Sequence, residues 1–245
     1  MRIGGFTMAV VAVALALGVA TTSAQTGGGV ARAVGAVEPV VVELFTAQGC
    51  AGCPEANGLL EPLAERPGVI LLTWPVDYWD WQGWKDTLAR PAFSARQRDY
   101  VEALRLRAPS TPQVIVDGRR TVPAVAGALD LAVAEETRRR VWPPDMAFRD
   151  AGARIGVGRG EAPEGGAEVV AVIFTPGVQT VRVDRGDNRG KTVRQVNVVR
   201  RVAPLGPWTG RPGLYDLPDD LAPGDGVAVL VQSRADRVIL AAALR

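Results

Sequence analysis

The sequence contains no histidine and only two cysteines among its 245 residues. Without histidine, the chain excludes Ser-His-Asp and Cys-His catalysis and histidine-based metal sites. The formal charge of +2 is too close to neutral to indicate a nucleic-acid-binding protein, so we expect no nucleic-acid partner. Hydrophobic residues make up 47% of the chain and charged residues 22%, which is typical of one or two globular domains with apolar cores.

The two cysteines, Cys50 and Cys53, are separated by two residues at a predicted strand-to-helix junction. This spacing and position are typical of a redox-active dithiol. Free amide groups and the helix dipole of a first helical turn favour a thiolate on Cys50. Cys53, one turn further along, is then placed to attack a mixed disulfide and release the partner. We therefore expect Cys50 to be the more exposed and more reactive thiol.

Two other interpretations of the cysteine pair compete with the redox-active dithiol. A zinc site needs about four ligands, and the chain offers no further cysteine and no histidine, so we expect no metal and no other cofactor. A passive disulfide is the stronger alternative. Because the loop between the cysteines is so short, closing it removes little chain entropy and stabilises the fold poorly. Thiol exchange and a passive disulfide both stay open on the sequence alone.

The N-terminus has the pattern of a secretory signal peptide over residues 1–24. Arg2 provides the positive charge, residues 8–20 form an apolar stretch, and Thr22-Ser23-Ala24 supplies small residues at a cleavage site. The apolar stretch is short for a membrane span, so we expect cleavage and no stable span afterwards. Residues 25–37 are predicted to be a flexible lead-in. The predicted location is periplasmic or secreted, where thiols can stay oxidised.

One acidic residue interrupts the apolar strand that precedes the cysteines. Glu43 lies within the strand predicted over residues 39–46, seven positions before Cys50. Its carboxylate either faces solvent near the strand end or is a partly buried proton acceptor for the thiol of Cys53. The sequence does not decide between these two interpretations.

Tryptophan is concentrated in one short segment, with four of the six tryptophans between Trp74 and Trp84. This segment either packs its rings over a sheet edge or forms an aromatic wall that binds a substrate beside the dithiol. In the second interpretation, Trp79 and Trp84 are substrate-binding residues.

The order of predicted elements divides the chain into two parts. Hydrophobic periodicity and turn residues predict strand, helix, strand, helix, strand, strand, helix over residues 38–142. This order is typical of a thioredoxin-like α/β domain, with a mixed sheet flanked by helices. Alternating patterns after Pro143-Pro144 predict a small all-β, sandwich-like domain over residues 147–245. Its basic central hairpin indicates either solvated strand faces or an anion-binding surface.

Several separate segments form a recognisable set. The opening motif is Glu43-Leu44-Phe45-Thr46-Ala47-Gln48-Gly49-Cys50-Ala51-Gly52-Cys53-Pro54, and the other segments are Val76 to Asp80, Gly83 to Asp86, Thr111 to Gln113, Val116 to Arg119, Arg185 to Asn188 and Asn197 to Arg200. Together they resemble one bacterial family of exported proteins, catalogued as domain of unknown function 1223. The resemblance implies a thioredoxin-like fold but no established reaction. By similarity to thioredoxins in general, Cys50 would attack, Cys53 would resolve, and Pro112 would be a cis-proline. The backbone of Thr111 would then pair with substrate.

The sequence supports two functional hypotheses. In the first, the protein is an exported thiol–disulfide oxidoreductase, or a descendant of one, that exchanges disulfides with protein thiols or with a redox partner protein. In the second, it is a non-catalytic envelope binding protein with a passive disulfide, in which the aromatic segment and the β domain hold a partner.

Overall fold

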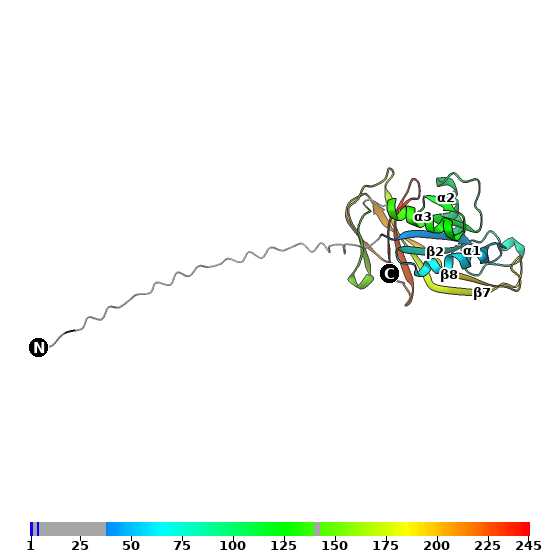
Figure 1. Ribbon diagram of the computed structural model, residues 1–245, viewed down its shortest axis with the longest axis horizontal. Coiled ribbons are helices and arrows are strands. Elements are labelled where there is room, and N and C mark those ends of the chain that lie inside the picture. Colours follow the sequence, from blue (N-terminus) through cyan, green and yellow to red (C-terminus); the bar gives the residue numbers. More distant parts are fainter. Residues whose placement is uncertain (2–3, 5–37, 140–142) are drawn as a thin grey trace. The chain divides into compact units, whose positions relative to one another are not determined.

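The computed structural model describes Met1, Gly4, and residues 38–139 and 143–245 (Figure 1). The expected signal peptide, apart from Met1 and Gly4, and the expected lead-in at 25–37 lie outside these residues. The described residues from 38 onward belong to one compact unit. No helix within the described ranges is long and apolar enough to cross a membrane.

The strands of this unit form one large mixed sheet and one small antiparallel sheet. The large sheet has the order β11-β10-β7-β8-β2-β1-β3-β4, and the small sheet has the order β5-β6-β9. The large sheet contains β1 (Val40–Thr46), β2 (Val69–Pro75), β3 (Gln113–Val116), β4 (Arg120–Val122), β7 (Ala167–Arg182), β8 (Thr192–Trp208), β10 (Gly226–Ser233) and β11 (Ile239–Leu244). The small sheet contains β5 (Met146–Arg149), β6 (Arg154–Val157) and β9 (Gly213–Asp216).

Strand β1 is central and buried on both faces, which explains its nearly continuous apolar sequence. It pairs in parallel with β2 and antiparallel with β3. Because side chains alternate along a strand, Val41 and Phe45 enter one hydrophobic core while Val42 and Leu44 enter another on the opposite face. Glu43 therefore points to the same face as Phe45.

Three α-helices cover the two faces of this part of the sheet. Helix α2 (Pro91–Ala103) contributes Phe93 and Tyr100 to the core that contains Phe45. Helices α1 (Cys53–Leu60) and α3 (Ala126–Arg139) pack on the other face. Short 3-10 turns follow α1 (η1, Glu61–Glu65), precede α2 (η2, Asp80–Gln82) and follow β5 (η3, Asp150–Gly152).

The C-terminal strands differ from the separate sandwich predicted over residues 147–245. Strands β7, β8, β10 and β11 continue the large sheet, because β8 joins β2 in parallel through the pair Thr73 and Val198. Two side-chain hydrogen bonds support this junction. The Thr73 hydroxyl donates to the Val196 carbonyl at 2.5 Å, and the Asn197 amide donates to the Leu71 carbonyl at 3.2 Å. The C-terminal part is thus β-rich, but it shares its main sheet with the preceding part.

The small sheet gives this C-terminal part its own core. Ile155 and Val157 of β6 pack with alternate residues of β7 and β10, including Val169 and Val229. The opposite side chains of β7 and β10 join the core beneath α2. Two sheets are therefore stacked in this part of the chain, and one of the two layers is the continuation of the large sheet. Strand β9 was missed because its four residues are only partly buried and give a weak pattern.

Candidate functional site

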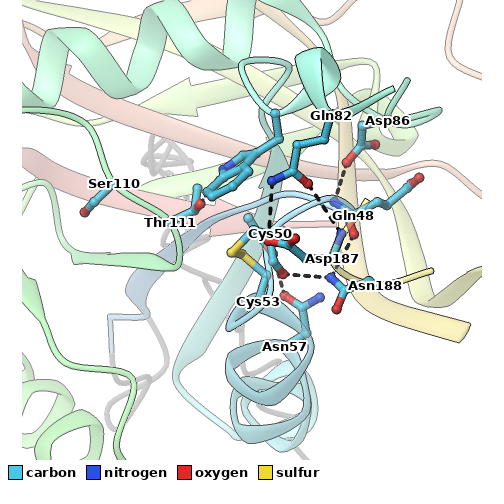
Figure 2. The surroundings of a disulfide bond; sticks show 12 residues. Gln48, Cys50, Cys53, Asn57, Gln82, Asp86, Ser110, Thr111, Asp187 and Asn188 are labelled. Carbon is cyan, nitrogen blue, oxygen red and sulfur yellow. Dashed lines mark hydrogen bonds between the residues drawn. A yellow bond between two sulfur atoms is a disulfide. The ribbon is translucent and has the colours of Figure 1, made fainter. Parts of the chain in front are cut away.

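Cys50 and Cys53 form a disulfide bond at the junction between β1 and α1 (Figure 2). Cys50 lies in the connecting loop, and Cys53 is the first residue of α1. The exposed fraction is 2% for Cys50 and 0% for Cys53, so both are buried, and Ala51 and Gly52 form the exposed part of the loop. Cys50 is therefore more exposed than Cys53, as expected, but only by a small margin.

The η2 turn packs against the residue that precedes Cys50. A Cβ atom on Gly49 would lie 3.3 Å from the Cβ of Trp79 and 3.5 Å from Oε1 of Gln82. Glycine therefore permits a close approach of the η2 turn to the cysteine loop. The same approach accounts for the burial of Cys50, since Trp79 and Tyr78 pack against the core that contains both cysteines.

The Thr111–Pro112 segment lies beside the cysteine loop. The peptide bond between these residues is cis, as the similarity to thioredoxins implies. A Cβ atom on Gly52 would lie 3.7 Å from Cδ of Pro112, and the indole N–H of Trp79 donates to the Thr111 hydroxyl at 2.7 Å. Trp79, Thr111 and Pro112, three of the predicted site residues, are thus brought together next to the disulfide. An open pocket of about 350 Å³ adjoins Pro112, lined in part by Leu106, Ser110, Gln113 and Val122.

The tryptophans of the aromatic segment have different surroundings. Trp74 is fully buried in the core, whereas Trp79 and Trp84 are half-buried. The indole N–H of Trp84 donates to Oε1 of Gln48 at 2.8 Å, so this predicted site residue contacts the loop before Cys50. Trp81 in the η2 turn is 78% exposed. The segment therefore has one ring in the core, two against the cysteine loop and its neighbours, and one in solvent. Substrate binding by Trp79 and Trp84 stays a prediction.

Glu43 is fully buried and belongs to a polar cluster that we call the core ion pair: Glu43, Arg96, Tyr100 and Gln232. Arg96 donates from Nε and Nη2 to the two carboxylate oxygens of Glu43, at 2.7 and 3.2 Å. The Tyr100 hydroxyl also donates to Glu43, and Gln232 accepts from Arg96 at 3.0 Å. The carboxylate is thus bound by α2 side chains rather than facing solvent. Its role as proton acceptor for Cys53 stays a prediction.

Burial and neighbouring charges shift the pKa values of Arg96 and Tyr100 in the core ion pair. Burial raises the pKa of Tyr100 well above its usual range, which keeps the hydroxyl protonated and able to donate to Glu43. Burial is the largest single effect on Arg96 and acts to lower its pKa, but the interactions with Glu43, Tyr100 and Asp99 together outweigh it and raise the pKa. The guanidinium also lies 4.8 Å from the ring centroid of Trp74. The cluster therefore remains a charged, hydrogen-bonded pair in the core.

A second polar cluster, which we call the loop clamp, consists of Gln48, Asp86 and Asn188. Oδ2 of Asp86 accepts the backbone N–H of Gln48 at 2.7 Å, and Oδ1 accepts the N–H groups of Leu88 and Ala89. Nδ2 of Asn188 donates to the carbonyl oxygens of Gln48 and Cys50, at 2.9 and 2.7 Å (Figure 2). The clamp therefore fixes the backbone on the N-terminal side of the disulfide.

The loop clamp was not predicted, although its residues stand in segments that carried the family resemblance. Gln48 belongs to the opening motif, Asp86 is the last residue of the segment Gly83 to Asp86, and Asn188 is the last residue of the segment Arg185 to Asn188. All three are polar, yet their exposed fractions are 4% or less. Nothing in their spacing shows that they meet, because Asn188 lies 138 positions after Cys50.

The basic residues of the β7–β8 hairpin are partly paired with acids. Arg194 binds Glu61 at 2.6 Å, Arg200 binds Asp225 at 2.6 Å, and Arg201 binds Asp220 at 2.5 Å. These pairs favour the solvated-face interpretation for this stretch of β8. No group of three or more Cys, Asp or Glu side chains suited to a metal ion occurs in the part of the chain that the structure describes.

The fold and site define a mixed α/β protein with a buried disulfide between a strand and a helix, clamped by a distant hairpin. The chain belongs to a family of proteins of unknown function, DUF1223, whose profile matches residues 41–232. No curated protein matches the chain.

Two solved structures are similar over most of the chain. A crystal structure from Agrobacterium tumefaciens is 33% identical, covers 84% of this chain and 92% of its own, and superposes with a TM-score of 0.71. HBP35 of Porphyromonas gingivalis is 13% identical, covers 85% of this chain and 74% of its own, and has a TM-score of 0.57. At that identity, the second likeness concerns the fold alone.

Proposed function

We propose that this protein is an exported thiol–disulfide oxidoreductase whose residues 38–142 form a thioredoxin-like unit. The strand order β2-β1-β3-β4, with β1 parallel to β2 and antiparallel to β3, supports the fold assignment. The apolar N-terminal pattern supports export to the periplasm or beyond, where a disulfide persists. Partners in this proposal are thiols and disulfides of other proteins.

The observation that carries the proposal is the bonded pair of cysteines at the start of α1, with Pro112 alongside. The chain contains no other cysteine, so each of the two can pair only with the other or with another molecule. A bond that encloses two residues contributes little to stability through chain entropy. A disulfide in this place is better explained by exchange than by stapling.

The proposed exchange balances in both directions. In the oxidising direction, a substrate thiolate attacks Sγ of Cys50, the Cys50–Cys53 bond breaks, and Cys53 leaves as a thiolate that takes up a proton. A second substrate thiolate then attacks the substrate sulfur of the mixed disulfide and releases Cys50. The substrate loses two electrons and two protons, and the protein gains a dithiol. The reducing direction is the reverse, and a second protein thiol or disulfide restores the starting state.

The surroundings of the disulfide favour a protein segment as substrate. Ala51 and Gly52 expose the loop, the Thr111–Pro112 segment lies next to it, and Trp81 stands in solvent on the adjacent turn. Exposed aromatic rings are common anchors of protein interfaces. Because Cys50 is only 2% exposed, a substrate reaches it after a small displacement of the η2 turn.

An insulin reduction assay tests the proposed function with wild type, Cys50→Ser and Cys53→Ser. We expect turnover only in wild type. Cys53→Ser should accumulate a mixed disulfide on Cys50, detected by mass spectrometry, because the resolving thiol is missing. Equal rates in all three proteins would refute catalysis.

The burial of both cysteines favours one alternative, a binding protein with a passive disulfide. A redox titration separates the two functions. A potential of about −270 to −120 mV is the range of exchange catalysts. A pair that ordinary thiols leave oxidised would support the passive disulfide, and then exposed Trp81 would be the first residue to test for partner binding.

A further inference from the structure

Asn188 is buried at the tip of a hairpin whose neighbouring residues are exposed. It lies between β7 and β8, its exposed fraction is 0%, and Asp187 and Arg189 on either side are exposed. Its Oδ1 accepts a hydrogen bond from Nζ of Lys191 at 3.1 Å. This bond fixes the orientation of the side-chain amide, so both N–H groups point at the cysteine loop (Figure 2).

The two acceptors of Asn188 are carbonyl groups on the N-terminal side of the disulfide. The Cys50 carbonyl accepts from Asn188 at 2.7 Å and from the backbone N–H of Cys53 at 3.2 Å. The Gln48 carbonyl accepts from Asn188 at 2.9 Å, while the Gln48 N–H is held by Asp86. The Cys50 backbone is therefore fixed by a side chain that belongs to the C-terminal part of the chain.

We propose that Asn188 is a positioning residue that sets the acidity of the Cys50 thiol and, through it, the balance between disulfide and dithiol. The inference rests on the proposed thiol exchange and assigns the C-terminal hairpin a part in it. The carbonyl oxygens of Gln48 and Cys50 carry partial negative charges that disfavour a thiolate on Cys50, and the amide of Asn188 offsets these charges. A disulfide carries no charge, so the contact stabilises the reduced form selectively.

The chain offers a matched control in Asn197. This residue lies in β8, its Nδ2 donates to the Leu71 carbonyl at 3.2 Å, and its Oδ1 accepts from the Gly177 N–H at 3.1 Å. Its amide thus performs the same kind of bonding at the junction of β8 and β2, in contact with neither cysteine. Aspartate also tolerates the left-handed backbone of Asn197, with φ of 50°. Asn197→Asp therefore makes the same chemical change outside the site.

The first measurement is the pH dependence of Cys50 alkylation in phosphine-reduced protein, located by peptide mapping. We expect Asn188→Asp to raise the pKa of Cys50 by about one unit, because it removes both donors and adds a negative charge. Asn188→Ala removes the donors alone and should raise it by less, about half a unit. Asn197→Asp should leave it unchanged.

The second measurement is the equilibrium of each variant with reduced and oxidised glutathione. At a pH above the Cys50 pKa of both proteins, one pKa unit corresponds to a factor of ten, so Asn188→Asp should there shift the equilibrium about tenfold toward the disulfide. The shift should shrink as the pH falls below those values, because the thiol is then protonated in both proteins. Equal Cys50 pKa values in wild type and both Asn188 variants, or an equal shift in Asn197→Asp, would overturn the proposal. If Asn188→Asp does not fold, Asn188→Ala decides. A wild-type pair that glutathione leaves oxidised would refute the proposed exchange instead, while the alkylation result would still decide the role of Asn188.

Discussion

The core ion pair and the loop clamp are two buried polar clusters that bind different kinds of partner. In the core ion pair, side chains of β1, α2 and β10 bind one another within an apolar core. In the loop clamp, the side chains of Asp86 and Asn188 bind backbone groups of the loop that leads to Cys50. Side-chain pairing connects elements, whereas backbone pairing fixes a loop conformation. We infer that the core ion pair mainly affects the free energy of unfolding, whereas the loop clamp mainly affects the reactivity of the cysteine thiols.

Removing one member of the core ion pair should have the largest effect on stability. Arg96→Ala leaves the carboxylate of Glu43 buried without its positive partner, which should cost about 3–5 kcal/mol of unfolding free energy. Urea unfolding monitored by circular dichroism measures the loss. The double variant Glu43→Leu/Arg96→Leu is the control, and it should recover most of the stability because no charge is left unpaired. A loss below about 1 kcal/mol in Arg96→Ala would contradict a stabilising role for the ion pair.

Breaking the loop clamp at Asp86 should reduce the free energy of unfolding less than Arg96→Ala does, and it should change the reactivity of Cys50 more. In Asp86→Asn, one of the two carboxylate oxygens becomes an NH₂ group that faces backbone N–H donors, so we expect a loss of about 1–3 kcal/mol. Cys50 alkylation in the reduced protein should change in rate more than it does in Arg96→Ala. If Arg96→Ala alters the alkylation rate as much, the two clusters do not have separate roles.

The same position should show a pH dependence with a defined sign. Burial raises the pKa of Asp86 above its ordinary value of 3.8, despite the backbone N–H groups that lower it. Between 3.8 and the raised value, Asp86 binds more protons in the folded than in the unfolded state. The free energy of unfolding therefore falls as the pH rises through this window. The free energy of unfolding of wild type should exceed that of Asp86→Asn by more below pH 3.8 than at neutral pH. A difference that grows with pH would contradict a raised pKa of Asp86 in the folded protein.

The smallest effect is expected at the surface, for the pair of Arg194 and Glu61. The hydrogen bond from Arg194 lowers the pKa of Glu61 below its ordinary value of 4.5, so any stabilisation is present above that pH and is lost as the pH falls. Both side chains are solvent-accessible, and water and salt screen their attraction. Arg194→Gln should unfold at the same urea concentration as wild type at neutral pH and moderate salt. A clear shift of the urea midpoint would show that this exposed ion pair contributes to the free energy of unfolding, contrary to the expectation for a solvent-screened pair.

Local patterns in the sequence predicted most elements of the first part of the chain. The apolar run at 40–46, the short strands at 113–116 and 120–122, and the helices beginning at Pro91 and Ala126 lie where periodicity and turn residues place them. The division into two separate sheets was wrong because it depends on the pairing of β8 with β2. That pairing joins segments more than 120 residues apart, and it uses a single pair of residues with no local signal.

The candidate site was predicted only where a recognisable motif marks its residues. The cysteine loop, Trp79 and the Thr111–Pro112 segment lie beside one another in the structure. Glu43 was recognised as unusual, but its partners Arg96 and Gln232 come from distant elements. Gln48 and Asn188 gave no signal, because a polar residue in a turn-rich segment is expected at the surface. Their burial is a result of tertiary structure.

The distance between Asn188 and Cys50 in the chain sets an order of assembly. A ribosome makes the two cysteines and the start of α1 long before it makes the β7–β8 hairpin, and the cysteines, only three positions apart, can meet without any of the later chain. The clamp cannot close until the hairpin that carries Asn188 has been made. A nascent chain therefore passes through a stage in which the two cysteines are present without the hairpin that holds their loop. At that stage the reactivity of the thiols is that of a loop without the Asn188 hydrogen bonds.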